Sequence, residues 1–350
     1  MLINKFNNSI KEFNSLNSKE KASHIGNWLL ERAMVIIILL LVIYIQSKRP
    51  AFLATANLVN MIQLTATRLP IALGIAGTII LTGTDLSAGR VVGLGAFVSS
   101  ILLQKAVANR FLTGGSPMNV LLALIIVLAS GALIGVINGF CVAKFKLHPF
   151  IVTLSTQLVT YGLYLTLSSA KQISNLDDSY TNNLLTSPLI KIGSTPMAMY
   201  VLFALIVTII MWFIWNKTTF GKNMFAVGSN EEAARVSGVN VTMVIIGVFT
   251  LAGITYGYTG FVEAARLGAS TGTVGLNYEL DAIAACVIGG VSFVGGIGKI
   301  SGVILGVLLM QLIIVGMTFL GISGSVTYII KGLVILVACA IDMRKYLTKK

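Results

Sequence analysis

Few residues in this sequence could perform covalent or redox chemistry. The closest approach to a phosphate-binding loop is the stretch Gly-Gly-Ile-Gly-Lys-Ile at residues 295–300. A nucleotide-binding loop needs an earlier glycine and a hydroxyl residue directly after the lysine, and both are missing here. The two histidines, His24 and His148, and the three cysteines form no cluster with metal-ligand or Cys-x-x-Cys spacing. We therefore expect no catalytic residue, no metal and no cofactor.

The polar loop over residues 216–240 carries the pattern of a short helix between two apolar segments. Ser229 and Glu232 have the S-x-x-E spacing of a capping box, in which two side chains satisfy free amides at a helix start. Gly238 suits the position just after a helix end, where a left-handed backbone is favoured. A helix of about two turns is unstable alone, so it must dock on something. The docking helix and its caps comprise Ser229, Asn230, Glu231, Glu232, Ala233, Ala234, Arg235 and Gly238.

Two interpretations of this docking helix are open. It could lie on the membrane surface or pack on its own bundle. Alternatively, it is a coupling helix that fits a groove on a soluble partner. Ala233 and Ala234 would then allow close approach, while the charged side chains Glu231, Glu232 and Arg235 would set the register.

Ionisable side chains near the ends of apolar segments are the next candidates, because charges within a membrane are costly and mark functional sites by default. Asp85 and Arg90 lie five residues apart at a glycine-rich turn and could pair. Glu263 and Arg266 have the i,i+3 spacing of a local helix pair. No carboxylate falls clearly in the middle of an apolar segment. These groups either cap and pair locally or contribute to a translocation path.

Two further acidic residues, Glu279 and Asp281, precede another apolar segment, and Asp281 fits the N-cap of that segment. Uncharged polar residues inside apolar segments either line a path or form hydrogen bonds between helices. The candidate path residues are Asp85, Asn138, Thr153, Ser155, Gln157, Tyr161, Glu263 and Asp281.

Membrane-spanning helices must hold these residues. The chain is 56% hydrophobic and 11% charged, with a mean hydropathy of +0.90, whereas a soluble domain has about 25% charged residues. A helix of roughly 17–25 apolar residues spans a bilayer. Such runs are expected near 33–47, 57–82, 91–109, 118–140, 150–170, 197–215, 241–262, 280–296, 300–320 and 326–343. The sequence thus predicts an all-α, polytopic membrane protein of about ten transmembrane helices with a short cytoplasmic coupling helix.

The run 57–82 contains Arg68 and Pro70, so it could be broken or kinked. The excess of 25 Lys+Arg over 12 Asp+Glu indicates the cytoplasmic side of a membrane protein and argues against nucleic acid as a partner. Basic residues gather in an N-terminal tail (1–32), in the 216–240 loop and in a C-terminal tail (344–350). Even numbers of predicted segments separate these regions, so all three are expected in the cytoplasm, around a transmembrane domain over 33–343.

A possible internal repeat involves two glycine triplets. The first is Gly83, Gly89 and Gly93, and the second, with the same spacing, is Gly296, Gly302 and Gly306. Repeats of this kind occur in transporters beside the pathway, although 35 glycines also produce such spacing by chance. Of these residues, Gly83, Gly89, Gly296 and Gly302 are candidate structural glycines.

Four long motifs carry a resemblance to a known family. They are T-T-F-G-K-N-M-F-A-V-G-S-N-E-E-A-A-R-V-S-G-V-N-V (Thr218–Val241), T-G-T-D-L-S-A-G-R (Thr82–Arg90), P-F-I-V-T-L (Pro149–Leu154) and E-L-D-A-I-A-A-C-V-I-G-G-V-S-F-V-G-G (Glu279–Gly296). In type and order they resemble the ribose/galactose/xylose permease family of ATP-binding-cassette (ABC) importers. The similarity covers residues 50–343, and E-A-A followed by Gly238 looks like the loop by which such permeases engage their ATPase.

Within that family, the sequences of these motifs are most similar to the galactose/methyl-galactoside branch, at Thr84, Ala88 and the run from Tyr278 to Gly296. His148 departs from the threonine expected there, which leaves the sugar less certain. The resemblance implies a permease that is not itself an enzyme, in a bacterial cytoplasmic (inner) membrane. It also implies a second permease copy, a separate ABC ATPase subunit, and a sugar-binding protein that is periplasmic or tethered to the surface.

Three alternatives remain beside this expectation. One is an ion-coupled secondary sugar transporter, which the missing mid-segment carboxylate disfavours. Another is an ABC permease for a different monosaccharide, such as ribose. A membrane enzyme or scaffold is the third, and the absence of a catalytic constellation argues against the enzyme.

Overall fold

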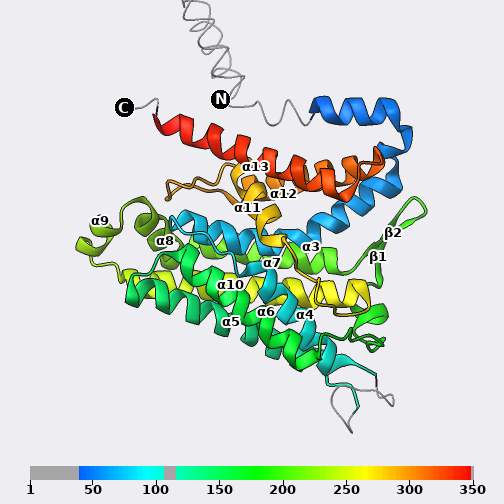
Figure 1. Ribbon diagram of the computed structural model, residues 1–350, viewed down its shortest axis with the longest axis horizontal. Helices are drawn as coiled ribbons and strands as arrows, with labels where there is room; N and C mark the ends of the chain where they lie inside the picture. Colours follow the sequence, from blue (N-terminus) through cyan, green and yellow to red (C-terminus); the bar gives the residue numbers. More distant parts are fainter. Residues whose placement is uncertain (1–38, 106–115, 348–350) are drawn as a thin grey trace, which may run out of the picture.

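A computed structural model describes residues 39–105 and 116–347, with side chains as far as residue 340 (Figure 1). The expected N-terminal tail (1–32), the start of the predicted span 33–47, the end of the predicted span 91–109 and residues 348–350 lie outside the described residues.

Six helices in the described part are long and apolar enough to cross a membrane. They are α3 (Thr55–Ile80), α5 (Val120–Phe145), α6 (Pro149–Ser168), α7 (Tyr200–Lys217), α10 (Val241–Leu267) and α12 (Ile300–Phe319). Shorter apolar helices are Leu39–Lys48, α4 (Ala88–Leu103) and the stretch Gly324–Ala340 of α13 (Gly324–Leu347). The other elements are η1 (Pro50–Leu53), η2 (Thr181–Leu185), β1 (Pro188–Ile192), β2 (Thr195–Ala198), α8 (Thr219–Ser229), α9 (Glu231–Val236) and α11 (Tyr278–Ile288).

The mostly helical, polytopic architecture agrees with the sequence, whereas the described residues do not confirm the expected count of about ten spans. The predicted span 280–296 is the clearest difference, since α11 stops at Ile288 after 11 residues. Gly290, Gly295 and Gly296 have φ values of +83°, +91° and +67°, a left-handed backbone that no α-helix contains. Conversely, Pro70 does not break the run 57–82, because α3 continues through it for 26 residues.

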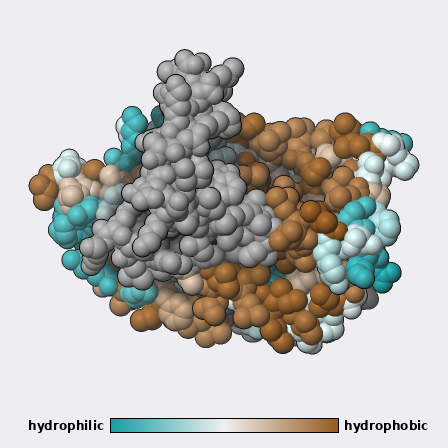
Figure 2. All heavy atoms as spheres, turned by 90° about the horizontal axis from the view of Figure 1, so that it is seen from above, coloured by the Kyte–Doolittle hydropathy of each residue, from teal (hydrophilic) through white to brown (hydrophobic). Residues whose placement is uncertain are grey.

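The long helices lie side by side, with α8 and α9 at one end of the bundle and the antiparallel β1–β2 hairpin at the other (Figure 1). Apolar residues make up most of the coloured surface to the right of and below the grey atoms in Figure 2, and polar residues gather towards its left and right ends. Many large apolar side chains on α5, α6 and α7 are exposed in the isolated chain, among them Leu133, Leu158 and Phe213. This distribution suits a bundle whose flanks contact lipid and whose ends contact water.

Glycines let α10 pack closely at the centre. A methyl group on Gly131 of α5 would overlap the carbonyl oxygen of Gly253, and one on Gly260 would overlap the carbonyl oxygen of Val92 in α4. Small residues at such crossings are typical of membrane proteins, where close backbone approach replaces the hydrophobic effect as the force between helices. The result is that α4 and α5 pack directly on the α10 backbone.

Non-helical segments enter the bundle beside two of the short helices. Residues 81–87 precede α4, and Asp85 lies against Tyr256 near the middle of α10. Residues 268–277 precede α11, and Gly275 packs on Gly89 in the first turn of α4. The starts of α4 and α11 therefore meet inside the bundle. Such discontinuous helices are tolerated at membrane depth only where protein surrounds the irregular backbone.

We predict that Gly131→Ala destabilises the protein by about 1–3 kcal/mol, because the added methyl group must push α5 away from α10. Thermal unfolding of the detergent-purified protein, followed by tryptophan fluorescence, measures the effect. Gly162→Ala is the matched control, since nothing lies within 4 Å of that position on α6. Equal unfolding temperatures for the two variants would contradict the close α5–α10 contact.

Candidate functional site

The loop between α7 and α10 folds as two helices, α8 and α9. Thr218 caps α8 by accepting a hydrogen bond from the Gly221 amide at 3.1 Å. The N-cap of α9 is Asn230, whose side-chain oxygen accepts from the Ala233 amide at 2.9 Å. The predicted capping box was thus placed one residue too early: Ser229 is the last residue of α8, and its hydroxyl donates to the Phe225 carbonyl at 2.8 Å.

The short helix α9 presents one face to its own chain and another to solvent. Ala234 is buried against α8 and α10. Glu231 and Glu232 both pair with Arg235, and the Glu232 side chain is 77% exposed. Val236 is 88% exposed, which is unusual for a valine at the end of a helix. The helix therefore docks on its own bundle and still offers a free surface.

Gly238 ends α9 as the sequence predicts. Its φ is +84°, and the Val239 amide donates to the Ala234 carbonyl at 3.0 Å. A residue with a side chain adopts this left-handed conformation only at a cost of roughly 1–2 kcal/mol.

The end of α8 contacts two other segments at a single junction. The Gly296 amide donates to the carbonyl of Ile80 at 2.9 Å, and Ile80 is the last residue of α3. A methyl group on Gly228 would overlap that same carbonyl, and one on Gly296 would overlap the Ser229 side chain. We call Ile80, Gly228, Ser229, Gly295 and Gly296 the glycine junction. The end of α8 therefore packs closely on the end of α3 and on the 289–299 loop.

The buried segment 81–87 is held from both sides by candidate path residues. The Ser87 hydroxyl donates to the Asp85 carboxylate at 2.6 Å, and the Asn138 amide of α5 donates to Ser87 at 3.0 Å. On the other side, the Thr153 hydroxyl of α6 donates to the Thr84 carbonyl at 3.2 Å and accepts from the Leu86 amide at 3.1 Å. The Thr84 carbonyl and the Leu86 amide thus obtain their hydrogen bonds from a side chain of α6.

The expected pair of Asp85 and Arg90 does not form. Asp85 is satisfied by Ser87, whereas the Arg90 guanidinium lies over the Tyr161 ring, 3.9 Å from its centroid. Arg90 also donates to the Tyr164 hydroxyl at 3.3 Å and to the Gly272 carbonyl at 3.2 Å. Arg90 begins on the first turn of α4, and its side chain reaches α6 and the 268–277 segment, so it bridges three elements.

A second charged cluster lies between α3, α10 and α11. Glu263 and Arg266 form the predicted i,i+3 pair, with an oxygen–nitrogen distance of 2.8 Å. Arg68 joins them at 3.8 Å from Glu263 and stacks on Tyr278, 3.1 Å from the ring centroid. The Glu263 side chain is fully buried. We call Arg68, Glu263, Arg266 and Tyr278 the charged cluster.

Asp281 was predicted as an N-cap, and this is wrong. It lies inside the first turn of α11, after the N-cap position Asn277, and pairs with Lys331 of α13 at 2.8 Å. Three carboxylates, those of Asp85, Glu263 and Glu279, are buried. Asp85 precedes α4, Glu263 is near the end of α10 and Glu279 is in the first turn of α11, so none of the three lies in the middle of a helix. Glu279 presents an oxygen without a hydrogen-bond partner in the described residues, next to Gly89.

Two candidate path residues lie apart from these contacts. The Ser155 hydroxyl is exposed and donates to the Ile151 carbonyl of its own helix at 2.8 Å. Gln157 is half-buried on the same helix.

The predicted glycines lie at helix contacts: Gly83 packs on Pro149, Gly89 on the start of α11, and Gly302 on the Gly289 carbonyl after the end of α11. One glycine of each triplet, Gly89 and Gly302, therefore packs at an end of α11.

Sequence reasoning missed the partners Arg68, Tyr164, Tyr278 and Lys331. A charged residue inside an apolar run was the available signal for Arg68 and Lys331. Nothing local identifies the tyrosines.

A polar cavity of about 580 Å³ lies at the hairpin end of the bundle, next to Arg266. Lys105, Asp178 and Asn182 also line it. A hydrogen bond from Lys105 lowers the pKa of the Asp178 carboxyl below its ordinary value.

The described residues contain no group of three or more His, Cys, Asp or Glu side chains that could hold a metal ion. Many of their polar groups form hydrogen bonds and ion pairs between helices. The arrangement can hold helices together, and it can offer hydrogen bonds to a polar solute.

Comparisons with known proteins give consistent results. Residues 57–339 match the family model described as branched-chain amino acid transport system / permease component. The galactose/methyl galactoside import permease protein of Salmonella typhimurium is 43% identical over 92% of this chain and 97% of its own length. That of Haemophilus influenzae is 40% identical over 91% and 96%. The ribose import permease protein of Escherichia coli is 34% identical over 91% and 95%. No solved structure matches the chain.

We predict that Glu263→Gln lowers the free energy of unfolding by about 3–5 kcal/mol, because it leaves Arg68 and Arg266 without their buried counter-charge. Glu231→Gln is the control: it breaks an ion pair on exposed side chains, and such pairs contribute about 0–1 kcal/mol. Thermal unfolding in detergent compares the two. A Glu263 variant as stable as the Glu231 variant would show that the charged cluster does not hold the helices together.

Proposed function

The chain belongs to the branched-chain amino acid transport system / permease component family, and from this we propose that it is the membrane-spanning subunit of an ABC importer for galactose and methyl galactosides. The observation that carries the proposal is identity of 40–43% over nearly the whole chain with galactose/methyl galactoside import permeases. Ribose import permeases reach 34%. The chain forms the translocation pathway and is not an enzyme, since ATP hydrolysis belongs to a separate subunit.

The free face of α9 is the surface we assign to the ATPase. It carries Glu231, Glu232 and Arg235 as charged groups around the exposed Val236. A well-exposed apolar side chain surrounded by charges is the usual composition of a small protein contact, with the apolar group as the anchor. Ala233, which is exposed beside them, allows the partner to approach closely.

The glycine junction is the route by which motion of α8 and α9 would reach the pathway. The Ile80 carbonyl contacts both Gly228 and Gly296, and residue 80 is followed directly by the buried 81–87 segment. Packed interfaces with no slack switch between discrete arrangements and do not deform gradually. ATP binding to the partner subunit would then favour one of two arrangements by binding it more tightly.

The translocation path is proposed to pass the polar contacts that hold the interrupted helices. Asp85 is part of the 81–87 segment, and Asn138 and Thr153 form hydrogen bonds to that segment. Beside it, the Arg90 guanidinium stacks on the Tyr161 ring. Glu263 and Asp281 belong to the neighbouring contacts with Arg266 and Lys331. Ser155 and Gln157 are on the exposed side of α6, and they would reach the path only in an assembly with a second permease copy.

We further propose the arrangement of the assembly. The chain lies in a bacterial cytoplasmic membrane as a homodimer, with both termini and the α8–α9 end in the cytoplasm. The basic residues Lys217, Lys222 and Arg235 at that end support this orientation. A sugar-binding protein, periplasmic or tethered to the surface, would deliver sugar at the opposite end, where the β1–β2 hairpin and the polar cavity beside Arg266 lie.

Buried carboxylates such as Glu263 and Glu279 are the feature that an ion-coupled transporter would also need. Glu263 is paired with Arg266 and Arg68, which suits a structural role in holding α3 and α10 together. Family membership also favours the ABC importer.

Uptake assays test the proposed function. We predict that the chain, expressed in a bacterium that lacks its own galactoside permease but keeps the matching ATPase and sugar-binding protein, restores accumulation of labelled galactose and not of ribose. Accumulation should survive an ionophore while ATP remains high. Collapse under the ionophore would instead indicate ion coupling, and accumulation of ribose alone would reassign the sugar.

We predict that Glu232→Lys and Gly238→Ala abolish uptake while membrane insertion stays normal, because the first reverses a charge on the free face of α9 and the second strains its end. Co-purification of the ATPase should fall in parallel. Gly321→Ala is the matched control, as Gly321 has a similar φ of +73° in open space outside the loop. Normal uptake by both loop variants would refute the coupling role.

A further inference from the structure

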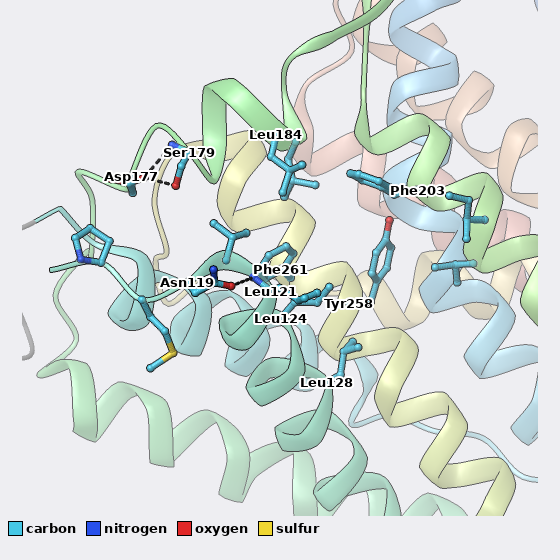
Figure 3. Close-up of a pocket in the computed structure, with 16 residues that line it drawn as sticks. Asn119, Leu121, Leu124, Leu128, Asp177, Ser179, Leu184, Phe203, Tyr258 and Phe261 are labelled. Carbon is cyan, nitrogen blue, oxygen red and sulfur yellow. Dashed lines mark hydrogen bonds between the residues drawn. The ribbon is translucent and has the colours of Figure 1, made fainter.

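A large apolar groove opens at the hairpin end of the bundle, away from α8 and α9. Its volume is about 900 Å³. The first turns of α5 supply Leu121, Leu124 and Leu128, the first half of α7 supplies Phe203, and the second half of α10 supplies Tyr258 and Phe261 (Figure 3). The edge residues Leu121 and Ile206 are exposed, and α5, α7 and α10 are apolar enough to span a membrane, so the groove opens on a surface that suits contact with lipid.

The groove runs along the helices. Leu121, Leu124 and Leu128 follow one another at i, i+3 and i+7 and therefore form one stripe on α5. At a rise of 1.5 Å per residue this stripe is about 10 Å long. A groove parallel to membrane-spanning helices has the direction that the hydrocarbon chains of a lipid take in a bilayer.

The rim of the groove is polar and negatively charged. Asp177 lies there with Ser179, whose amide donates to the Asp177 carboxylate at 2.8 Å (Figure 3). No basic side chain pairs with Asp177 within the described residues, whereas the adjacent Asp178 pairs with Lys105 at 2.7 Å. Within the described part of the chain, the rim thus presents one carboxylate without a basic partner beside an apolar channel.

We propose that this groove binds a phospholipid with an ammonium headgroup, of the phosphatidylethanolamine class, from the leaflet opposite the α8–α9 end. One acyl chain lies along Leu121, Leu124 and Leu128, and the ammonium group pairs with Asp177. The combination of a charged rim and an apolar channel along the bilayer normal matches the shape and charge distribution of such an amphiphile.

A second copy of the chain fits this groove less well. Two-fold contacts place the same patch of both copies against each other, which would bring two uncompensated Asp177 carboxylates to one interface.

Photo-crosslinking of the full-length protein in defined bilayers tests the proposal. The probes are a phosphatidylethanolamine and a phosphatidylglycerol with the same diazirine-bearing acyl chain, and labelled residues are mapped by mass spectrometry. We expect the ethanolamine probe to label α5 and α7 residues that line the groove. Leu128→Trp, which fills the channel, should remove this labelling. Leu122→Trp, on the exposed face of α5 outside the groove, should leave it unchanged.

Asp177→Asn tests the headgroup contact without altering the channel. It should reduce the preference for the ethanolamine over the glycerol probe by about two- to fivefold, the range expected for one exposed ion pair. Labelling spread evenly over the apolar flanks, or undiminished in Leu128→Trp, would overturn the site. An unchanged headgroup preference in Asp177→Asn would overturn the assigned lipid class, and crosslinks between Leu124→Cys copies would identify a second permease chain as the occupant.

Discussion

Hydrocarbon offers no hydrogen bonds to a protein backbone, and this constraint governs how the chain is built. Continuous helices such as α5 and α10 satisfy it alone. The irregular segments 81–87 and 268–277 cannot, and each accepts hydrogen bonds from side chains of neighbouring helices. Side chains of α5 and α6, Asn138 and Thr153, hold the first, and Arg90 holds the second through the Gly272 carbonyl. The buried polar residues thus exist largely because the helices are interrupted.

Close backbone contact is the second consequence of the same constraint. Association in a membrane depends on packing, so glycines occur where helices cross, at Gly131 and Gly253 and around both ends of α11. The glycine junction extends this pattern to the end of the bundle, where it connects α8 to α3 and to the 289–299 loop. Contacts without slack transmit displacement, and this property is what a permease driven by a separate ATPase requires.

The charged cluster adds rigidity at a cost. Burying Glu263 is unfavourable unless its counter-charges are close, and Arg266 and Arg68 provide them from two different helices. Asp281 and Lys331 repeat the arrangement between α11 and α13. The short helix α11 is therefore bound to α3, α12 and α13 by polar and glycine contacts together, while the flanks of α5, α6 and α7 remain apolar and available to lipid or to another subunit.

The sequence by itself determined the membrane class, the positions of the long helices and the existence of α9 with Gly238 at its end. These features depend on hydropathy over one helix length or on capping within a few residues, which are local properties. The Glu263–Arg266 pair was predictable for the same reason, since its members are one helical turn apart.

Tertiary structure alone decided the remaining contacts. Arg90 finds Tyr164 and Gly272, 74 and 182 residues away, in place of nearby Asp85. Asp281 pairs with Lys331 across 50 residues, so it does not serve as a cap. The glycine run that ends α11 at Ile288 is as apolar as a span on a hydropathy scale, and its left-handed backbone follows from the contacts it makes with α3 and α8. Partners of this kind depend on which helices come together, and no local pattern encodes that.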